Sequence, residues 1–380
     1  MKYRLESFGG ILALENPPML VHVDKEFMLG LGCTPSPLWE GPRTSLLSAP
    51  LEVHFSVTNA CSKRCGHCYM DSGERDAGEI SAEGFRRAVD LLAGMGVFHM
   101  ALGGGEALER PDFFELASYV RDLGIVPNLT TNGLRLTRET AGKCRIFGQV
   151  NISVDWSENI GTFGQGEDSF AQRTKGVDLL LEAGVSVGLN CVVTRQNFDR
   201  LGEVLAFAAQ RNLTDVEFLR FKPSGRGKLE YFEKRLTPDQ NLEFYPMLKR
   251  FYEDYNIPAK IDCSFVPMFC FHRPDKSLME QFSVYGCEAG NVLLGVRSDG
   301  RFAGCSFMSG DESIFDLPRL WNGSEHLDRL RNWTYQAPEP CRSCEYLEIC
   351  KGGCRAVSEF VTGEMFTPDP ECPFVVSEDK

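Results

Sequence analysis

Between about residue 52 and residue 222, short apolar runs alternate with segments in which apolar residues recur at helical spacing. Several runs are the continuous apolar stretches typical of buried parallel strands. The predicted strands are residues 52–56, 98–102, 127–130, 150–154, 185–193 and 216–221. Strands that alternate with helices form βα units around a parallel sheet. We therefore predict an α/β fold in which six units form a partial (β/α)6 TIM-like barrel.

The alternation ends near residue 257, and beyond it Pro, Gly and Cys become frequent, which is typical of loop-rich structure. Residues 10–23 predict two short strands around a turn at residues 16–18. We therefore expect an N-terminal β-hairpin-like extension (1–50), the barrel (51–257) and a loop-rich C-terminal domain (258–380).

Composition narrows the function. The chain has 40 Lys and Arg against 53 Asp and Glu, a net charge of −13, and no basic run, which argues against a nucleic-acid or membrane-surface partner. No stretch approaches the roughly 18–20 apolar residues of a membrane span, and the first ten residues lack a signal-peptide pattern. We expect a cytoplasmic protein, whose 15 cysteines serve metal or redox chemistry rather than disulfides.

The first cysteine group, Cys61, Cys65 and Cys68, follows the first predicted strand of the barrel. Three thiolates on one short loop suit a [4Fe–4S] cube that leaves one iron without a protein ligand. A zinc site with a distant fourth ligand is the alternative. An open iron would bind a chelating molecule.

Residues 61–69 read CSKRCGHCY, which resembles the CxxxCxxC loop of the radical S-adenosylmethionine (SAM) superfamily. The resemblance implies a partial barrel, a [4Fe–4S] cluster, and SAM bound through its amino and carboxylate groups to the free iron. It also implies that Tyr69 packs near the adenine, although core packing would equally explain an aromatic residue there.

Further motifs that resemble those of the family follow the later predicted strands. Proteins with parallel sheets bind their ligands at the carboxyl ends of the strands. Gly103-Gly104-Gly105-Glu106 resembles the GGEP motif, with Ala107 in place of proline. Gly104 and Gly105 would let the backbone approach SAM, and Glu106 would accept hydrogen bonds from its ammonium. Thr131-Asn132-Gly133 is interpreted as a structural turn.

Four polar residues on later strands complete the SAM site that the resemblance implies. They are Ser153 and Asp155 at the ribose, Asn190 as a further contact of that kind, and Arg220 at the carboxylate. Strand-end capping is the alternative for Ser153 and Asp155, and a surface salt bridge is the alternative for Arg220.

The second cysteine region has seven cysteines in the spacing of the SPASM domain, a C-terminal extension of many radical SAM enzymes. The resemblance implies two auxiliary [4Fe–4S] clusters; zinc is the alternative. The implied ligands are Cys287, Cys305 and Cys354 for the first cluster, and Cys341, Cys344, Cys350 and Cys372 for the second. The fourth ligand of the first cluster is Cys270, which we favour slightly, or Cys263, or a substrate sulfur on an open iron.

The resemblance implies that SAM is cleaved to a 5′-deoxyadenosyl radical, which abstracts hydrogen from a peptide or protein and leads to oxidation or crosslinking. A reductant such as flavodoxin or ferredoxin would supply the electron. Ser306 follows Cys305 where sulfatase maturases carry an aspartate, which counts against that activity. About 50 residues precede the barrel, fewer than the winged-helix leader-binding module of many peptide maturases, so a separate leader-binding protein is expected if the substrate has a leader.

Two other functions stay open at this point. Radical SAM enzymes of haem d1 and alternative haem synthesis, which modify tetrapyrrole side chains, have a similar length and SPASM tail. Phe265, Met268, Phe269 and Phe271 could line a pocket for such a small-molecule substrate, although core packing is favoured. A non-catalytic iron–sulfur electron carrier is the third hypothesis.

Overall fold

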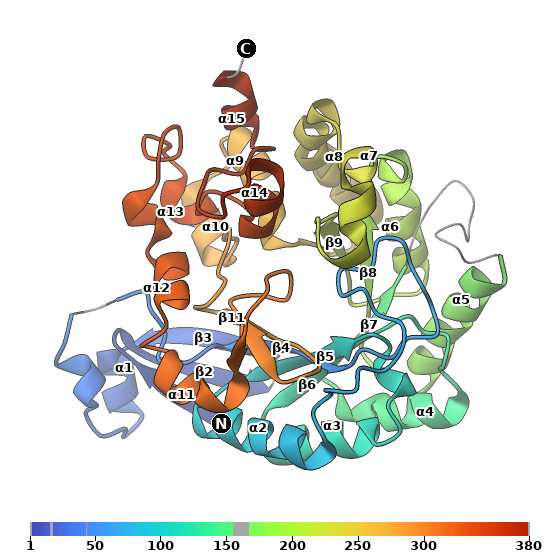
Figure 1. Ribbon diagram of the computed structural model, residues 1–380, viewed down its shortest axis with the longest axis horizontal. Coiled ribbons are helices and arrows are strands. Elements are labelled where there is room, and N and C mark those ends of the chain that lie inside the picture. The colour runs from blue at the N-terminus through green and yellow to red at the C-terminus, as the bar shows by residue number, and fades with distance from the viewer. Residues whose placement is uncertain (1, 16–17, 43, 155–166, 379–380) are drawn as a thin grey trace.

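A large mixed sheet and a small antiparallel sheet organise the chain (Figure 1). The computed structural model describes residues 2–15, 18–42, 44–154 and 167–378. The strands of the large sheet, in spatial order, are β10 (Ala259–Ile261), β9 (Asp215–Arg220), β8 (Val187–Val193), β7 (Val150–Ser153), β6 (Val126–Thr131), β5 (His99–Gly104), β4 (Glu52–Thr58), β11 (Leu293–Val296), β12 (Arg301–Ala303) and β13 (Glu312–Ser313). Strands β4 to β9 lie in chain order and are parallel, which confirms the six predicted strands.

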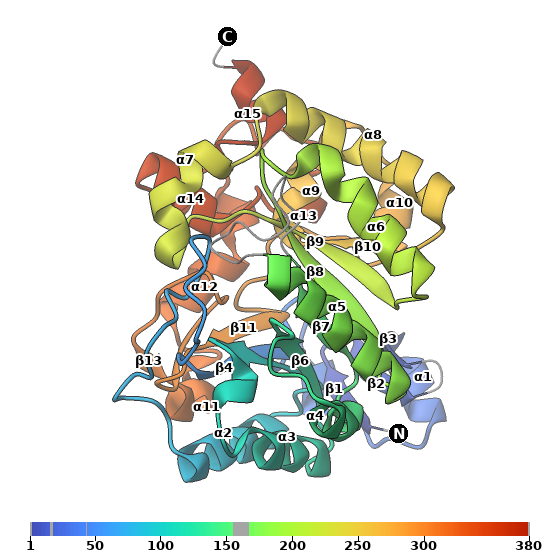
Figure 2. The ribbon, with the colours of Figure 1, turned by 90° about the vertical axis from the view of Figure 1, so that its right-hand side faces the viewer.

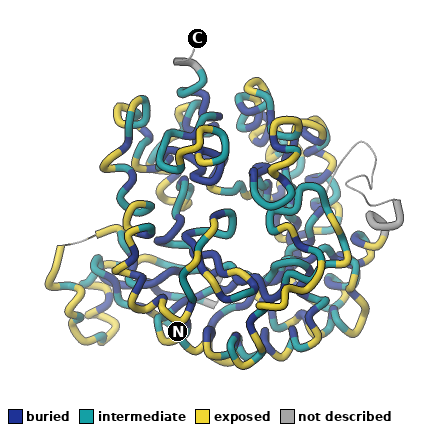
Figure 3. The backbone as a smooth tube through the Cα atoms, viewed as in Figure 1, coloured by how far each residue is buried: buried dark blue, intermediate teal, exposed yellow. Residues whose placement is uncertain are grey.

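The helices between these strands cover one face of the sheet (Figures 1 and 2). They are α2 (Ala82–Gly94), α3 (Phe113–Asp122), α4 (Arg138–Lys143), α5 (Glu167–Glu182) and α6 (Leu201–Gln210), followed by α7 (Tyr231–Lys234) and α8 (Pro238–Tyr255). Alternation along β4 sets its two faces: Val53, Phe55 and Val57 are buried in the main core, whereas Glu52 and His54 point to the opposite, inner face. In Figure 3 the buried residues accordingly follow the strands, and the exposed ones lie on the outer helices.

The predicted end of the barrel at residue 257 is not an end of the sheet. Strand β10 pairs in parallel with β9, and β11 pairs in parallel with β4, so two strands from the expected C-terminal domain extend the sheet at both edges. The antiparallel strands β12 and β13 follow β11. The two parts of the chain therefore share one sheet.

The remaining C-terminal helices lie away from α2 and α3 in Figure 1, except the one at residues 317–320, which lies beside α2. They are α9 (Val266–Phe271), α10 (Lys276–Gln281), α11 (Leu317–Leu320), α12 (Glu325–Arg331), α13 (Leu347–Cys350), α14 (Arg355–Thr362) and α15 (Pro373–Glu378). Phe265 and Met268 are fully buried, and the ring of Phe265 lies 4.2 Å from that of Phe244, measured between centroids. Phe269 packs against Tyr245, and Phe271 against Phe374. These four apolar residues therefore serve core packing.

The N-terminal part holds three strands rather than the predicted two: β1 (Lys2–Glu6), β2 (Gly9–Glu15) and β3 (Pro18–Asp24), followed by α1 (Lys25–Gly30). Asn16 and Pro17 of the predicted turn lie outside the described residues. Arg4 joins this sheet to the barrel, because its guanidinium donates to the carbonyl oxygens of Ala49 at 2.7 Å and Pro50 at 2.9 Å and pairs with Glu6. Within the described residues, no helix is both long and apolar enough to cross a bilayer.

Candidate active site

Cys61, Cys65 and Cys68 lie on one loop that begins directly after β4. The amide of Cys61 donates to the carbonyl of Gly73 at 2.8 Å, and that of Cys68 to the carbonyl of Cys65 at 3.2 Å. The thiol sulfur of Cys68 accepts from the amide of Ser72 at 3.4 Å. The loop thus keeps three thiols together at the carboxyl edge of the sheet, which is the donor set that a [4Fe–4S] cluster requires.

A second loop, residues 224–226 after β9, holds the cysteine loop in place. The Ser224 hydroxyl donates to the carbonyl of Tyr69 at 2.9 Å, and the Arg226 amide donates to that of Cys68 at 2.9 Å. The Arg226 guanidinium also donates to the carbonyl of Cys65, at 2.9 Å from Nε. Sequence reasoning missed this role, because nothing local connects residues so far apart in the chain.

The GGGE motif packs directly against the cysteine loop. Gly104 has a φ of +119°, and a Cβ built on Gly105 would lie 2.2 Å from the carbonyl oxygen of Ala60, so the two segments touch only because these positions lack side chains. Glu106 is buried and accepts hydrogen bonds from the Thr131 hydroxyl at 2.7 Å and the Asn132 amide at 2.8 Å. Burial raises the pKa of Glu106, although these hydrogen bonds oppose the shift. The turn that follows β6 therefore positions Glu106.

The structure brings together Ser153, at the end of β7, and Asn190, in the middle of β8, as register partners. The side-chain oxygen of Asn190 is buried and has no hydrogen-bond partner among the described residues. An orphaned acceptor at this edge is what a bound ligand with a hydroxyl donor would satisfy. Asp155 lies outside the described residues.

Tyr69 lies between the cysteine loop and the C-terminal domain. Its ring centroid is 5.0 Å from that of Phe307. Burial, together with the neighbouring Cys68 and Cys305 thiols, raises the pKa of Tyr69 to about 12. The aromatic residue after the third cysteine thus also contacts the loop that carries Cys305.

Arg220 lies in a buried ion pair, not in the surface salt bridge that was the alternative for it. Its guanidinium is buried and donates to both oxygens of Asp369, at 2.6 and 3.0 Å, and to Glu371 at 2.8 Å. It also donates to the carbonyl of Ser264 at 2.9 Å. Both terminal nitrogens therefore bind protein acceptors in a buried ion pair, and Nε has no hydrogen-bond partner among the described residues. A contact of Arg220 with the SAM carboxylate stays a prediction.

Four further cysteines form one neighbourhood, the Cys263 group: Cys263, Cys287, Cys305 and Cys354. Burial raises the pKa of Cys263, and the neighbouring Asp262, Cys287 and Cys354 add to the shift. Burial also raises the pKa of Cys305 to about 12, with contributions from the Cys287 and Cys354 thiols. Cys263 is exposed to solvent, Cys287 and Cys305 are partly buried, and Cys354 is buried. Four neighbouring thiols fit the ligand set of a cluster, since a thiolate ligand takes metal in place of its proton.

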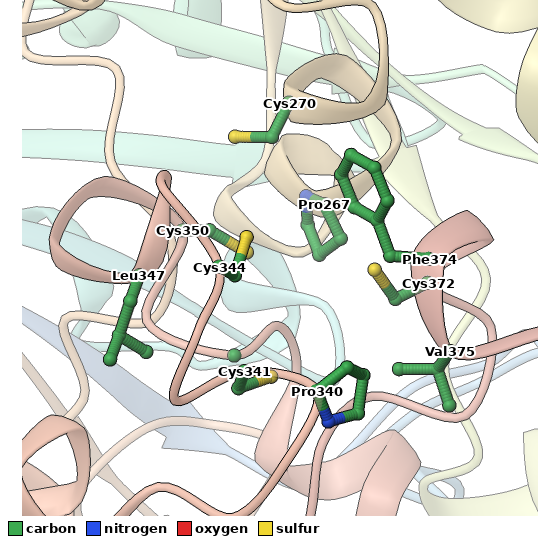
Figure 4. A pocket seen from close by; sticks show the side chains of 11 residues that line it. Pro267, Cys270, Pro340, Cys341, Cys344, Leu347, Cys350, Cys372, Phe374 and Val375 are labelled. Carbon is green, nitrogen blue, oxygen red and sulfur yellow. The ribbon is translucent and has the colours of Figure 1, made fainter. Parts of the chain in front are cut away.

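A cavity in the C-terminal domain is lined by a different set of thiols (Figure 4). They are the Cys341 group, defined as Cys341, Cys344, Cys350 and Cys372, together with Cys270. A hydrogen bond with Cys270 and burial raise the pKa of Cys350. Cys270 is thus the fifth thiol at the Cys341 group, whereas Cys263 neighbours Cys287 and Cys354. Which of the two binds a cluster stays a prediction.

No group of three His, Cys, Asp or Glu side chains in the described part of the chain converges as it would around a single metal ion. Thiolates that bind separate irons of a cube do not need that convergence. The cavity walls beside the five thiols are apolar, with Pro267, Leu347 and Phe374 among them. An apolar, cysteine-lined cavity is the surrounding in which iron–sulfur clusters are held.

The inner face of the sheet carries an ion pair that the sequence pattern did not single out. His54 and Glu52 on β4 approach to 3.5 Å between Nε2 and Oε1. The register partners of His54 are Ala101 on β5 and Gly295 on β11, both small, so the imidazole has room on both sides. Burial would lower the pKa of His54, but the hydrogen bond and charge of Glu52 raise it above the ordinary value.

Residues 55–208, which include the cysteine loop, the GGGE motif and Asn190, match the Radical SAM superfamily. A mycofactocin maturase, MftC of Mycolicibacterium smegmatis, is 31% identical over 338 residues, covering 86% of this chain and 83% of the relative. The chain belongs to the radical SAM superfamily. It is a radical SAM enzyme, and the motifs identified in the sequence are those of its family.

Other relatives agree on the family. The AdoMet-dependent heme synthase of Methanosarcina barkeri is 26% identical over 348 residues, covering 86% of this chain and 97% of that protein. The crystal structure of Streptococcus suis SuiB bound to S-adenosylmethionine covers 98% of both chains, with a TM-score of 0.75 and 18% identity. SuiB bound to its precursor peptide SuiA gives a TM-score of 0.77 at 17% identity over the same shares. These structures establish the shared fold.

Proposed function

We propose that this radical SAM enzyme is a peptide maturase that oxidises or crosslinks its substrate with the help of two auxiliary clusters. One observation carries the proposal: the chain holds three separate thiol groups, namely the cysteine loop, the Cys263 group and the Cys341 group. One cluster suffices to cleave SAM, whereas two more suit a reaction that must also remove an electron from its substrate.

Different residues of the site would have different roles in the reaction. Cys61, Cys65 and Cys68 would hold the cluster that, with SAM bound, supplies the 5′-deoxyadenosyl radical. Ser153 and Asn190 would accept and donate hydrogen bonds at the SAM ribose, and Glu106 would bind its ammonium. The two glycines before Glu106 let SAM approach the backbone. The protein's contribution is to orient one substrate C–H bond and exclude water.

The Cys263 group and the Cys341 group would hold the auxiliary clusters, with Cys263 as the fourth ligand of the first. The proposal also includes an external reductant of the flavodoxin or ferredoxin type, a cytoplasmic location, and a separate protein that presents the leader of the substrate. The acidic net charge of −13 fits a small, non-nucleic-acid substrate.

Peptide modification is favoured over tetrapyrrole modification. The mycofactocin maturase MftC is 31% identical to this chain, whereas the heme synthase is 26% identical. SuiB, which shares the fold, has been solved with a precursor peptide. The four apolar residues that would line a tetrapyrrole pocket are packed into the core or against other rings, which removes the feature that spoke for that substrate.

The test uses anaerobically reconstituted, reduced protein with SAM and the short peptide encoded beside its gene. We expect 5′-deoxyadenosine, a peptide mass lower by two hydrogens, and deuterium transfer from labelled peptide into 5′-deoxyadenosine. Cys68→Ala is the inactive control. Turnover of a sirohaem-derived tetrapyrrole with no change in peptides would overturn the peptide proposal, and absence of 5′-deoxyadenosine would leave only the electron-carrier hypothesis.

A further inference from the structure

A seven-residue segment, residues 220–226, links two of the three thiol groups, the cysteine loop and the Cys263 group. At its start Arg220 binds Asp369, whose carboxylate also accepts from the amide of Cys354 at 2.9 Å. At its end Arg226 binds the carbonyl of Cys65. Lys222, in the middle, is the member whose charge faces the Cys263 group.

The ammonium of Lys222 is enclosed by the C-terminal domain. The side chain is 4% exposed, forms an ion pair with Asp262, and places its nitrogen 4.3 Å from the ring centroid of Phe307. Although burial would lower it, the charge of Asp262 raises the pKa of Lys222, so the side chain stays protonated. The amide of Phe307 donates to the Cys305 sulfur at 3.3 Å, and Asp262 directly precedes Cys263, so a buried positive charge lies beside the group of thiols.

The charges of Lys222 and Asp262 both act on Cys263, but of the two only Lys222 acts on Cys305 and Cys354. Asp262 bears chiefly on Cys263, the next residue in the chain. Lys222 acts on Cys305 and is the largest electrostatic influence on Cys354. The negative charge of Asp262 is further dispersed, because its oxygens accept from the amide of Arg220 at 2.9 Å and from the Ser264 amide at 2.8 Å. The charge of Asp262 therefore does not cancel that of Lys222 at Cys305 and Cys354.

We propose that Lys222 is a positioning residue for electron transfer, whose ammonium raises the reduction potential of the cluster held by Cys263, Cys287, Cys305 and Cys354. This inference rests on the proposed function. In the reaction the substrate radical loses one electron to that cluster and one proton to water, so the cluster gains one negative charge. A fixed positive charge in a place with little water stabilises that added electron.

The experiment is an EPR-monitored redox titration of the reconstituted holoenzyme and its variants. Lys222→Met removes the charge and keeps much of the side-chain volume, and Lys222→Arg keeps the charge. Lys260→Met is the matched control, since Lys260 lies on the neighbouring strand β10, is 57% exposed and pairs with Asp215. We expect Lys222→Met to weaken reduction of one cluster about tenfold, a fall of about 59 mV for a one-electron couple.

The other two variants should stay near the wild-type potentials. An unchanged potential in Lys222→Met, or an equal shift in Lys260→Met, would overturn the inference. If Lys222→Met fails to retain iron, Asp262→Asn decides: leaving the ammonium unopposed should raise the same potential, and no rise would count against the role of Lys222.

Iron content and SAM cleavage, measured on the wild type in the same preparations, test the proposed function separately. An iron content that corresponds to a single cluster per chain would overturn both proposals. Iron for three clusters, with SAM cleavage and unchanged potentials in the Lys222 and Asp262 variants, would overturn only the inference on Lys222.

Discussion

The guanidinium of Arg220 and the carboxylate of Asp369 form a two-pronged ion pair across 149 residues, with Nη–Oδ distances of 2.6 and 3.0 Å. The pair joins β9 to the segment between Cys354 and Cys372. The Arg220 side chain is 3% exposed and that of Asp369 is fully buried. The charge of Arg220 keeps the pKa of Asp369 below its usual value even though burial opposes this.

Removing one partner of this pair should destabilise the protein strongly, because it leaves a buried charge without compensation. We expect Arg220→Met to lower the free energy of unfolding by about 3–5 kcal/mol in urea titrations. Arg138→Met is the matched control, since Arg138 is 86% exposed and pairs with Glu182 at the surface. Equal effects of the two substitutions would show that the buried pair contributes no more to the free energy of unfolding than a surface pair does.

The placement of Cys263 and Cys270 gives a direct test of cluster ligation. Cys263→Ser should lower the iron content and change the spectrum of one auxiliary cluster, because the Cys263 group then has three thiols. Cys270→Ser should leave the iron content unchanged, since the Cys341 group keeps four thiols without it. Iron analysis and EPR spectra of the two variants test these expectations. Loss of iron in Cys270→Ser but not in Cys263→Ser would show that Cys270, and not Cys263, is the fourth ligand.

Gly105 should be indispensable for the cysteine loop. An alanine there would place a methyl group about 2.2 Å from the carbonyl oxygen of Ala60, a distance that forces the loop away. We expect Gly105→Ala to lose most SAM-cleavage activity and the iron of the SAM-binding cluster while retaining the auxiliary clusters. Gly94→Ala, at the end of α2 with no atom nearby, should be neutral or slightly stabilising. A fully active Gly105→Ala enzyme would refute this contact.

The ion pair between His54 and Glu52 predicts a pH dependence of stability. Because the folded protein raises the pKa of His54 above its unfolded value near 6.5, the pair stabilises fully below that pH and its contribution is lost as pH rises through the folded pKa. Glu217 also raises this pKa, and Lys222 lowers it. Urea midpoints of the wild type and His54→Asn should therefore differ more at pH 5.5 than at pH 8.5; an equal difference at both would argue against the pair.

The strands that sequence could predict are those with continuous apolar runs. Strands β4 to β9 lie within a few residues of the predicted ranges. Strands of a buried parallel sheet are rich in apolar residues, and such runs are easily recognised in a sequence. Strand β1 and the short strands β10 to β13 were missed, since edge and hairpin strands of two to five residues carry little periodicity. The pattern also could not show that β11 returns to pair with β4, a contact between residues about 240 apart.

The candidate site divides in the same way. The cysteine loop and the GGGE motif are local, so their spacing sufficed to predict the family. The partners of Arg220 and the choice between Cys263 and Cys270 depend on tertiary contacts, which no local pattern encodes. Neither could therefore be predicted from residue type and order alone.

The contacts of residues 220–226 limit how such enzymes can be recombined. A chimera that joined this barrel to the C-terminal domain of a relative would have to import acceptors equivalent to Asp262 and Asp369, or it would bury two unmatched cations. Grafting therefore has to exchange β9 and its following loop along with the tail, and the useful crossover lies before residue 215 rather than at the apparent boundary near residue 257.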